Sequence, residues 1–323
     1  MNAGNGEAWA RPLGHRVAWA DLDPEANRAL VRRALEEDAG GLGFRERPGQ
    51  PGDVTSEWWI PAGADAAVEV VARESVTVAG LPLAAEVVAL VDPALRWEPT
   101  VPDGTSLPAG SVLAHLSGPA RSLLTAERTV LNFLQLLSGI ATTTAALVAE
   151  LASGPTRLLD TRKTIPGYRA LCKYAVACGG GWNHRRGLYD QVLLKDNHLA
   201  TGADGGGGSE PLPGDLVRRV EAFRRDRPEL PLEVEIDRLE DLEPVVAAGV
   251  DAVLLDNFSV EDLRRAVAIV DGRCQTEASG GIDRARLRQL AAVGLDYIST
   301  GATVHRAVWV DLAFDAGEDP CRG

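Results

Sequence analysis

Lysine is the scarcest charged residue in this 323-residue sequence. Only Lys163, Lys173 and Lys195 occur, so 30 of the 33 basic residues are arginine. All three lysines fall in one short window, whereas arginine is spread along the chain. A compact ammonium differs from a forked guanidinium in geometry and in how readily its pKa is tuned. The clustering favours a functional role for Lys163 and Lys195, while Lys173 is predicted to be structural, facing solvent from a helix.

Cysteine is rare too, and its spacing excludes two classes of protein. Four cysteines occur, none in a CxxC pair or at zinc-finger spacing from a histidine, which argues against a disulfide scaffold and a zinc module. No run of about 18 apolar residues and no secretory signal are visible. We therefore expect free thiols, a cytoplasmic location and no membrane segment.

The charge balance also argues against one class of partner, nucleic acid. The formal net charge is −13, which makes nucleic acid an unfavourable partner. A local cluster of basic residues is informative in such an acidic chain, because it opposes the overall bias.

The first part of the chain reads as mixed α and β structure. Helices are predicted over 23–37 and 80–91, and strands over 66–72, 95–101 and 111–116. A long helix is predicted over 125–151, with Thr125 as its N-cap. The tail, 313–323, is predicted to be frayed.

After residue 155 short apolar runs alternate with helical segments, which predicts parallel strands joined by helices. No GxGxxG follows the first run, so a barrel is favoured over a dinucleotide-binding sheet. The predicted strands are 157–160, 191–194, 233–236, 252–255, 275–278 and 297–299, and the helices are 168–178, 215–225, 239–248, 260–270 and 284–293. The Gly/Pro-rich segment 201–214 is predicted to be a flexible surface loop.

Charged or small residues follow every predicted strand, and in a parallel barrel those ends share one face. The cationic set is typical of a site for a polycarboxylate or a phosphorylated anion; it comprises Arg162, Lys163, His184, Arg185 and Lys195. Glu235 and Asp256 are oxygen ligands suited to Mg²⁺, although hydrogen bonding inside the barrel remains an alternative for them.

Two short turns of small residues follow the last two predicted strands. Ser279-Gly280-Gly281 and Gly301-Ala302 could bind a phosphate through backbone N–H groups. A barrel with an anion pocket, a Mg²⁺ site and a phosphate site indicates transfer of a phosphosugar.

Several motifs together resemble those of the quinolinate phosphoribosyltransferases. They are TRKT-x-PG at 161–167, NHR-x-GL at 183–188, KDNH at 195–198 and EASGG at 277–281. The resemblance runs from about residue 20 to 310. It implies an α/β fold of two parts: an N-terminal α/β sandwich, 1–124 joined by 303–323, and an incomplete parallel α/β barrel, 125–302, of the type II phosphoribosyltransferase kind.

The resemblance also implies the reaction and the roles of the residues. Quinolinate and phosphoribosyl pyrophosphate would give nicotinate mononucleotide, pyrophosphate and CO₂, in a homodimer whose Arg121 reaches the partner's site. Arg121 would join the cationic set in binding the substrates, and Glu235 and Asp256 would hold Mg²⁺ and the ribose hydroxyls. Ser279, Gly280, Gly281, Gly301 and Ala302 would bind the 5-phosphate. Lys163, Lys195, Glu235 and Asp256 are the candidates for catalysis.

Three features depart from the family pattern: Trp182, the run Thr303-Val304-His305 and the extended segment 201–214. Two other functions remain open. A Schiff-base lyase would use Lys195 at the end of a barrel strand. A relative that keeps the fold only for binding would not need the complete set of charged residues.

Overall fold

The computed structural model describes residues 11–151, 154–195, 198 and 216–317. The chain divides into two compact units. We call Met1–Arg16, Ala146–Arg169 and Gly181–His305 the barrel unit, and Val17–Ala145, Ala170–Gly180 and Arg306–Gly323 the sandwich unit. The division falls inside a long helix, after residue 145, rather than at the expected boundary after residue 124. The predicted loop 201–214 lies outside the described residues.

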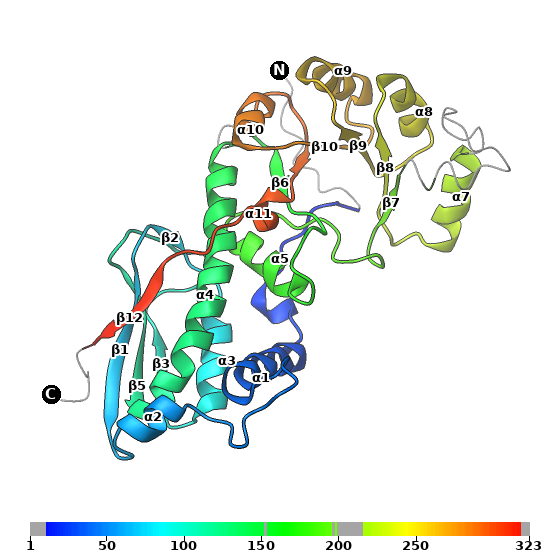
Figure 1. The fold of residues 1–323 in the computed structure, drawn as a ribbon. Helices are drawn as coiled ribbons and strands as arrows, with labels where there is room; N and C mark the ends of the chain where they lie inside the picture. Colours follow the sequence, from blue (N-terminus) through cyan, green and yellow to red (C-terminus); the bar gives the residue numbers. More distant parts are fainter. Residues whose placement is uncertain (1–10, 152–153, 196–197, 199–215, 318–323) are drawn as a thin grey trace. The chain divides into compact units, whose positions relative to one another are not determined.

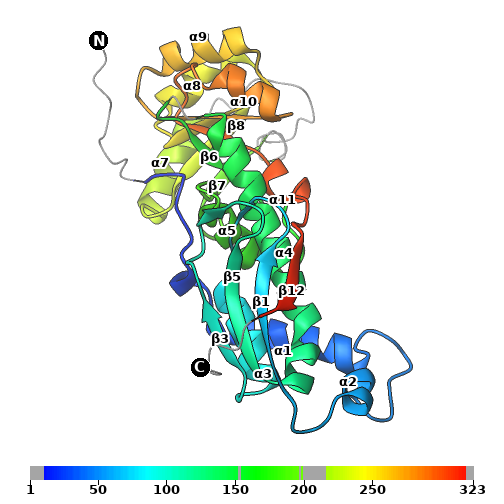
Figure 2. The same ribbon diagram turned by 90° about the vertical axis from the view of Figure 1, so that its left-hand side faces the viewer.

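The sandwich unit contains a four-stranded antiparallel sheet in the order β12-β1-β5-β3, visible in Figure 2. These strands are β1 (Asp65–Ala72), β3 (Arg96–Pro99), β5 (Val112–Pro119) and β12 (Leu312–Ala316). A small second sheet pairs β2 (Val76–Thr77) with β4 (Ser106–Leu107). The helices are η1 (Trp19–Asp21), α1 (Pro24–Gly40), α2 (Val54–Trp59), α3 (Leu81–Val91), α4 (Ala120–Ala149), which continues into the barrel unit, and α5 (Arg169–Cys178).

Local sequence explains α1 well. The Asp23 carboxylate caps the helix by accepting hydrogen bonds from the N–H groups of Glu25 and Ala26, and Pro24 occupies the first turn. The helix ends at Gly41, which has a φ of +66° that favours glycine.

The start of α4 corrects one prediction. The helix begins at Ala120, directly after β5 ends at Pro119, so Thr125 is not an N-cap. Its hydroxyl donates to the carbonyl oxygen of Arg121 inside the helix. The residues between Ala120 and Thr125 favour helix, and no loop separates the strand from the helix.

Among the described residues, only helix α4 is long and apolar enough to cross a membrane, by length and composition alone. However, 67% of its most apolar window is buried inside the protein, as in the core helix of a soluble fold. The sequence showed no continuous apolar run because threonine and charged residues interrupt this helix.

Two further predictions for the sandwich unit were wrong. Residues 312–316 are not frayed, because β12 pairs antiparallel with β1 and satisfies its backbone groups there. Lys173 lies in α5 as predicted but is only 1% exposed, so it does not face solvent. Its helix turns that face towards the core of the unit.

The barrel unit contains a six-stranded parallel sheet in the order β6-β11-β10-β9-β8-β7. Figure 1 labels all of these strands except β11. The first strand therefore neighbours the last, and the sheet is open between β6 and β7, as in an incomplete barrel. All six predicted runs are strands: β6 (Arg157–Leu159), β7 (Val192–Leu194), β8 (Leu232–Ile236), β9 (Ala252–Asp256), β10 (Gln275–Ser279) and β11 (Tyr297–Ser299). Trp182 forms an isolated bridge to Leu159 beside β6.

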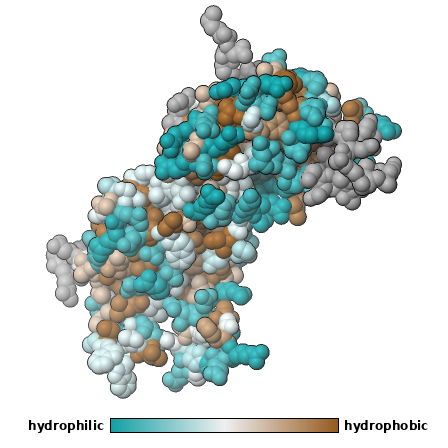
Figure 3. Space-filling model, turned by 45° about the horizontal axis from the view of Figure 1, so that its top comes forward, coloured by the Kyte–Doolittle hydropathy of each residue, from teal (hydrophilic) through white to brown (hydrophobic). Residues whose placement is uncertain are grey.

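Alternation along these strands separates two faces. Val234, Val253, Leu255 and Ala278 pack outward in the main core against the surrounding helices, which are α7 (Leu216–Asp226), η2 (Leu239–Asp241), α8 (Leu242–Ala247), α9 (Val260–Val270), α10 (Arg284–Leu290) and the short α11 (Ala302–His305). Figure 3 shows hydrophilic residues interspersed with apolar ones over one face. The opposite face carries the polar residues described below, which come from β8, β9 and β10.

Candidate active site

The expected site residues of the barrel unit lie at or just beyond the carboxyl ends of its strands. Because the strands are parallel, these ends share one edge of the sheet. Arg162 and Lys163 follow β6, and His184 and Arg185 follow the bridge at Trp182. Lys195 follows β7, Glu235 lies in β8, and Asp256 is the last residue of β9. Ser279 is the last residue of β10 and is followed by Gly280 and Gly281, while Gly301 and Ala302 come after β11. Arg121 lies in the first turn of α4, in the sandwich unit.

Arg162 and Arg185 bring two positive charges together. Burial lowers the pKa of Arg185, and the neighbouring charge of Arg162 lowers it further. The Nε of Arg162 is buried and donates no hydrogen bond within the described part of the chain. Buried N–H groups are normally paired, so this pair of guanidinium groups is suited to bind an anion.

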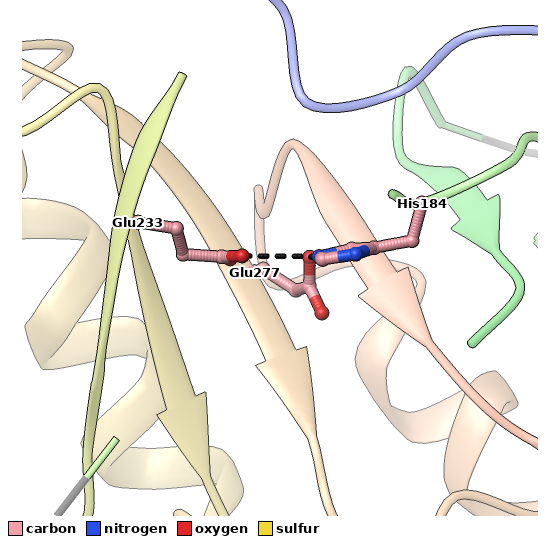
Figure 4. A group of neighbouring side chains, drawn as sticks. All are labelled: His184, Glu233 and Glu277. Atoms are coloured by element: carbon pink, nitrogen blue, oxygen red, sulfur yellow. Dashed lines mark hydrogen bonds and ion pairs between the residues drawn. The ribbon is translucent and has the colours of Figure 1, made fainter. Parts of the chain in front are cut away.

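His184 is buried, and its ring faces two carboxylates that come from different strands (Figure 4). Its Nε2 lies 3.0 Å from Oε2 of Glu233 and 3.3 Å from Oε2 of Glu277. Its backbone N–H donates to Oδ1 of Asp160 at 2.9 Å. Burial alone lowers the pKa of His184, but the charges of Glu277 and Glu233 raise it to about 10. The two adjacent carboxylates therefore favour the protonated form of the ring.

Sequence reasoning did not identify Glu233 or Glu277 as site residues. One signal was available: Glu233 and Glu235 are two residues apart in a strand, so both face the barrel interior. The contact between Glu277 and His184 could not be predicted from the sequence, because it depends on the register of β8, β9 and β10.

Lys195 and Glu235 form an ion pair, with 2.6 Å between Nζ and Oε2. Asp256 Oδ2 accepts a hydrogen bond from Asn257 Nδ2 at 2.8 Å. Glu235 pairs in register with Leu254, so Asp256 lies one step further along the same face. No hydrogen bond reaches the second oxygen of either carboxylate from any residue whose position is described. Carboxylate oxygens are the ligands that Mg²⁺ prefers, so these two are the candidates in this site to hold such an ion.

The two small-residue turns differ in detail. Gly280 has a φ of +91°, and a Cβ there would lie 2.1 Å from Oδ1 of Asn257. Gly281 also has a positive φ, +60°, but open space around it. At Gly301, a Cβ would lie 2.8 Å from Cδ of Lys163. The N–H of Ala302 donates to Oγ1 of Thr300, so it is already paired within its own turn.

Trp182, one of the departures from the family pattern, has a structural role. The guanidinium of Arg157 stacks over its ring at 4.1 Å from the centroid. The ring packs against a small buried cluster of Leu13, Leu159, Ala252 and Tyr297 inside the barrel. The larger residue therefore fills space beside β6, next to the segment that carries His184.

A parallel α/β barrel with paired cations, acidic residues and glycine turns at its strand ends defines a barrel enzyme that acts on an anionic substrate. Two family profiles match the chain: "Quinolinate phosphoribosyl transferase, N-terminal domain" over residues 53–138, and the corresponding "C-terminal domain" over residues 140–315. The chain belongs to the quinolinate phosphoribosyltransferase family.

Individual relatives agree with the profiles. The chain is 38% identical to a probable nicotinate-nucleotide pyrophosphorylase [carboxylating] from Synechocystis, over 94% of this chain and 95% of that protein. It is 40% identical to the corresponding protein of Mycobacterium leprae, over 92% and 99%. The solved structure of the nicotinate-nucleotide pyrophosphorylase from Francisella tularensis matches with a TM-score of 0.82 and 36% identity, over 94% of this chain and 100% of that one.

Proposed function

We propose that the protein transfers the phosphoribosyl group of phosphoribosyl pyrophosphate to quinolinate, with decarboxylation. The products are nicotinate mononucleotide, pyrophosphate and CO₂, in the biosynthesis of NAD. The family membership and the similarity to named pyrophosphorylases over nearly the whole chain support this activity. The name "decarboxylating" describes this reaction in the direction that releases CO₂, and "carboxylating" describes its reverse.

The single observation in the site that best supports the substrate is the cationic group at Arg162, His184 and Arg185. A protonated imidazole and two guanidinium groups lie at one end of the barrel, and Nε of Arg162 is buried without a hydrogen-bond acceptor among the described residues. A single carboxylate needs one bidentate partner, whereas this group offers enough donors for two. Quinolinate carries two carboxylates on adjacent ring carbons.

The chemistry requires positioning and charge stabilisation more than a general acid or base. The pyridine nitrogen attacks C1 of the ribose, and the bond from C1 to the pyrophosphate oxygen breaks. The ring nitrogen is then cationic. The bond from the ring to the neighbouring carboxylate breaks next, its electron pair is stabilised by that cation, and a proton replaces CO₂. Lys163 and Lys195 would orient the two substrates, and the cationic group would hold the ring in line with C1.

Glu235 and Asp256 would hold Mg²⁺, through the carboxylate oxygens that have no partner among the described residues. The ion supplies charge neutralisation for the departing pyrophosphate. The ion pair between Lys195 and Glu235 supports this arrangement, because it fixes the Glu235 carboxylate at the strand end. The two carboxylates would also bind the ribose hydroxyls.

The glycine turns would bind the 5-phosphate of the sugar. Gly280 and Gly281 both have positive φ, which turns the chain sharply after Ser279 and brings backbone N–H groups to the strand ends. Gly301 has no side chain beside Lys163, so a phosphate could approach both. Ala302 would contribute less, since its N–H donates to Thr300.

We further propose a homodimer in which Arg121 of one subunit completes the site of the other. A surface next to Arg121 supports this. Nε of Arg121 donates to the carbonyl oxygen of Ile60 at 2.7 Å, and the adjoining helix α2 presents Trp58 and Trp59 at 82% and 75% exposure. Exposed aromatic residues of this size are typical of surfaces that another protein covers. A higher oligomer is compatible with the same surface.

The location that fits this activity is the cytoplasm. The three cysteines in the described part of the chain, Cys172, Cys178 and Cys274, are thiols that form no disulfide, which fits a reducing compartment.

The experiment is an assay for nicotinate mononucleotide with phosphoribosyl pyrophosphate, Mg²⁺ and either quinolinate or nicotinate. We expect turnover with quinolinate and poor turnover with nicotinate, because one carboxylate would leave buried cations unpaired. Equal turnover of the two acids would show that the cationic group does not recognise the second carboxylate. Omission of Mg²⁺ should abolish the reaction if Glu235 and Asp256 act through the ion.

A further inference from the structure

The two buried carboxylates that face His184, those of Glu233 and Glu277, have no role in the chemistry described so far. Glu233 is 0% exposed and Glu277 is 1% exposed, although buried carboxylates are rare unless they are paired. Three of their four oxygen atoms are buried and accept no hydrogen bond among the described residues; one of the three, Oε2 of Glu277, instead forms an ion pair with His184. Such a costly arrangement calls for a compensating function.

Geometry places both carboxylates on the same atom of the histidine. Glu233 comes from β8 and Glu277 from β10, and each brings one oxygen to Nε2 of His184, as Figure 4 shows. The other end of the histidine is held through its backbone, because its N–H donates to Asp160. Asn183 Nδ2 donates to the same carboxylate at 2.9 Å. The imidazole is thus restrained at its backbone and at its ring.

The two carboxylates also affect the charge of His184. Arg185, the next residue, already lies beside Arg162, and burial disfavours the charged form of a histidine. A third cation at this place would lose its proton without nearby negative charge. The carboxylates of Glu233, in β8, and Glu277, in β10, supply that negative charge. The charge of Glu233 also acts on Arg185, which links the cluster to the proposed quinolinate pocket.

We propose that Glu233 and Glu277 are positioning residues that hold His184 as an imidazolium in a fixed orientation for one carboxylate of quinolinate. This inference rests on the proposed function for its substrate. The carboxylates do not touch quinolinate; they act through His184.

A metal ion is the alternative occupant, since the three donor atoms lie within 4.8 Å of one another. The hydrogen bonds oppose it. Oε2 of Glu233 already accepts a hydrogen bond from Nε2 of Gln191 at 3.0 Å as well as facing His184. Metal binding also requires a deprotonated Nε2, whereas the adjacent carboxylates favour the proton.

The first test reads the charge of His184 directly and does not depend on activity. The chain contains only five histidines, so ¹⁵N-histidine labelling gives few signals, and the His184→Gln variant assigns the one of interest. We expect imidazolium nitrogen shifts for His184 at about pH 8, above the ordinary histidine pKa of about 6.5. In Glu277→Gln the same signal should convert to the neutral form at lower pH than in the wild type, and Glu277→Asp should partly restore it.

The second test separates positioning from a structural role. Glu277→Gln should raise KM for quinolinate about tenfold or more while changing KM for phosphoribosyl pyrophosphate much less. In a His184→Gln background the same substitution should add nothing, because its route to the substrate has been removed. Asp296→Asn is the matched control. It makes the same carboxylate-to-amide change in the barrel, where Asp296 accepts hydrogen bonds from Thr276 and not from His184.

Several results would overturn the inference: a neutral His184 in the wild type, additive effects of Glu277→Gln and His184→Gln, or a stoichiometric metal in the purified protein that Glu277→Gln removes. If the spectra follow expectation but no variant and no wild-type protein makes nicotinate mononucleotide, the proposed function fails while the charge state of His184 stands. If Glu277→Gln does not fold, Glu277→Asp and Glu233→Gln carry the same comparison.

Discussion

Lys195 Nζ lies 2.6 Å from Glu235 Oε2, so a residue expected to bind substrate and one expected to bind Mg²⁺ are joined directly. The ammonium is compact, and its three donors can turn between this carboxylate and a substrate. A guanidinium at the same place is longer, planar and forked, and it would grip Glu235 from a different position.

We therefore expect Lys195→Arg to lose most of the activity although the charge is kept. A displacement of about 1 Å of a reacting group can cost on the order of a hundredfold in rate. Lys163→Arg should behave similarly, because the stem of Lys163 passes within 2.8 Å of where a Cβ on Gly301 would lie. Steady-state kcat and KM for both substrates measure the effect.

The control for these variants cannot be Lys173→Arg, since Lys173 is buried and a larger side chain there would strain the core. Arg218→Lys serves instead: it exchanges the same two residue types at an exposed position of α7. Near-normal turnover of Lys163→Arg and Lys195→Arg would mean that the clustering of lysines in the sequence was coincidence, whatever the activity of the enzyme.

Arg121→Ala should inactivate the enzyme, and mixing it with inactive Lys195→Ala should restore some activity. If Arg121 acts across a dimer interface, one site of each mixed dimer carries both defects and the other carries neither. Free exchange should then return roughly a quarter of full activity, because half of the dimers are mixed and half of their sites are intact. Each variant mixed with itself is the control. Demonstrated subunit exchange without recovery would place Arg121 in the site of its own subunit.

Gly280→Ala and Gly281→Ala form a matched pair. Both positions have positive φ, but a Cβ at Gly280 would lie 2.1 Å from Asn257 Oδ1 and 2.9 Å from its backbone nitrogen, whereas Gly281 has open space. Gly281→Ala should cost about 1 kcal/mol in unfolding free energy for its left-handed backbone alone. Gly280→Ala should cost clearly more and should raise KM for phosphoribosyl pyrophosphate, because the turn must shift. Denaturant titration and kinetics of the two variants give the comparison; similar losses would mean that Asn257 yields easily.

Sequence periodicity predicted the barrel well, for a physical reason. The runs from Arg157 to Ser299 are buried on their outer face and separated by helices, so their apolar pattern is strong and local. The antiparallel part was harder. Strand β12 pairs with β1 from the other end of the chain, and nothing within 312–316 shows that a partner is available.

The placement of candidate residues was predictable where they follow or end a strand directly, as Arg162, Lys195 and Asp256 do. Contacts that depend on the register between neighbouring strands could not be predicted. Glu233 and Glu277 meet at His184 only because two intervening strand pairings bring them to the same interior layer. The burial of Lys173 was missed for a similar reason, because the face of a helix that packs inward is set by its tertiary neighbours.

The stability of the protein should depend on the charge of His184 above neutral pH. In the folded protein Glu233 from β8 and Glu277 from β10 face its ring, with Asp160 at its backbone, and its pKa is raised to about 10. In the unfolded chain a histidine has a pKa of about 6.5. A raised folded-state pKa contributes stability that is complete below about pH 6.5 and is lost as the pH rises through about 10.

The unfolding free energy of the wild type should therefore fall more steeply than that of His184→Gln between about pH 8 and pH 10, by urea titration at each pH. Burial, followed by Glu277, raises the pKa of Glu233, whereas His184 lowers it, so removal of His184 also shifts the titration of this carboxyl. His184→Gln/Glu233→Gln is therefore measured as a second reference, in which neither group titrates. His115→Gln is the control, because His115 lies in β5 of the sandwich unit, where its partly exposed side chain is opposite Glu69 on β1 and Glu98 on β3. Parallel pH profiles for wild type and His184→Gln would mean that the imidazole is already neutral at pH 8, and that the two buried carboxylates have another role.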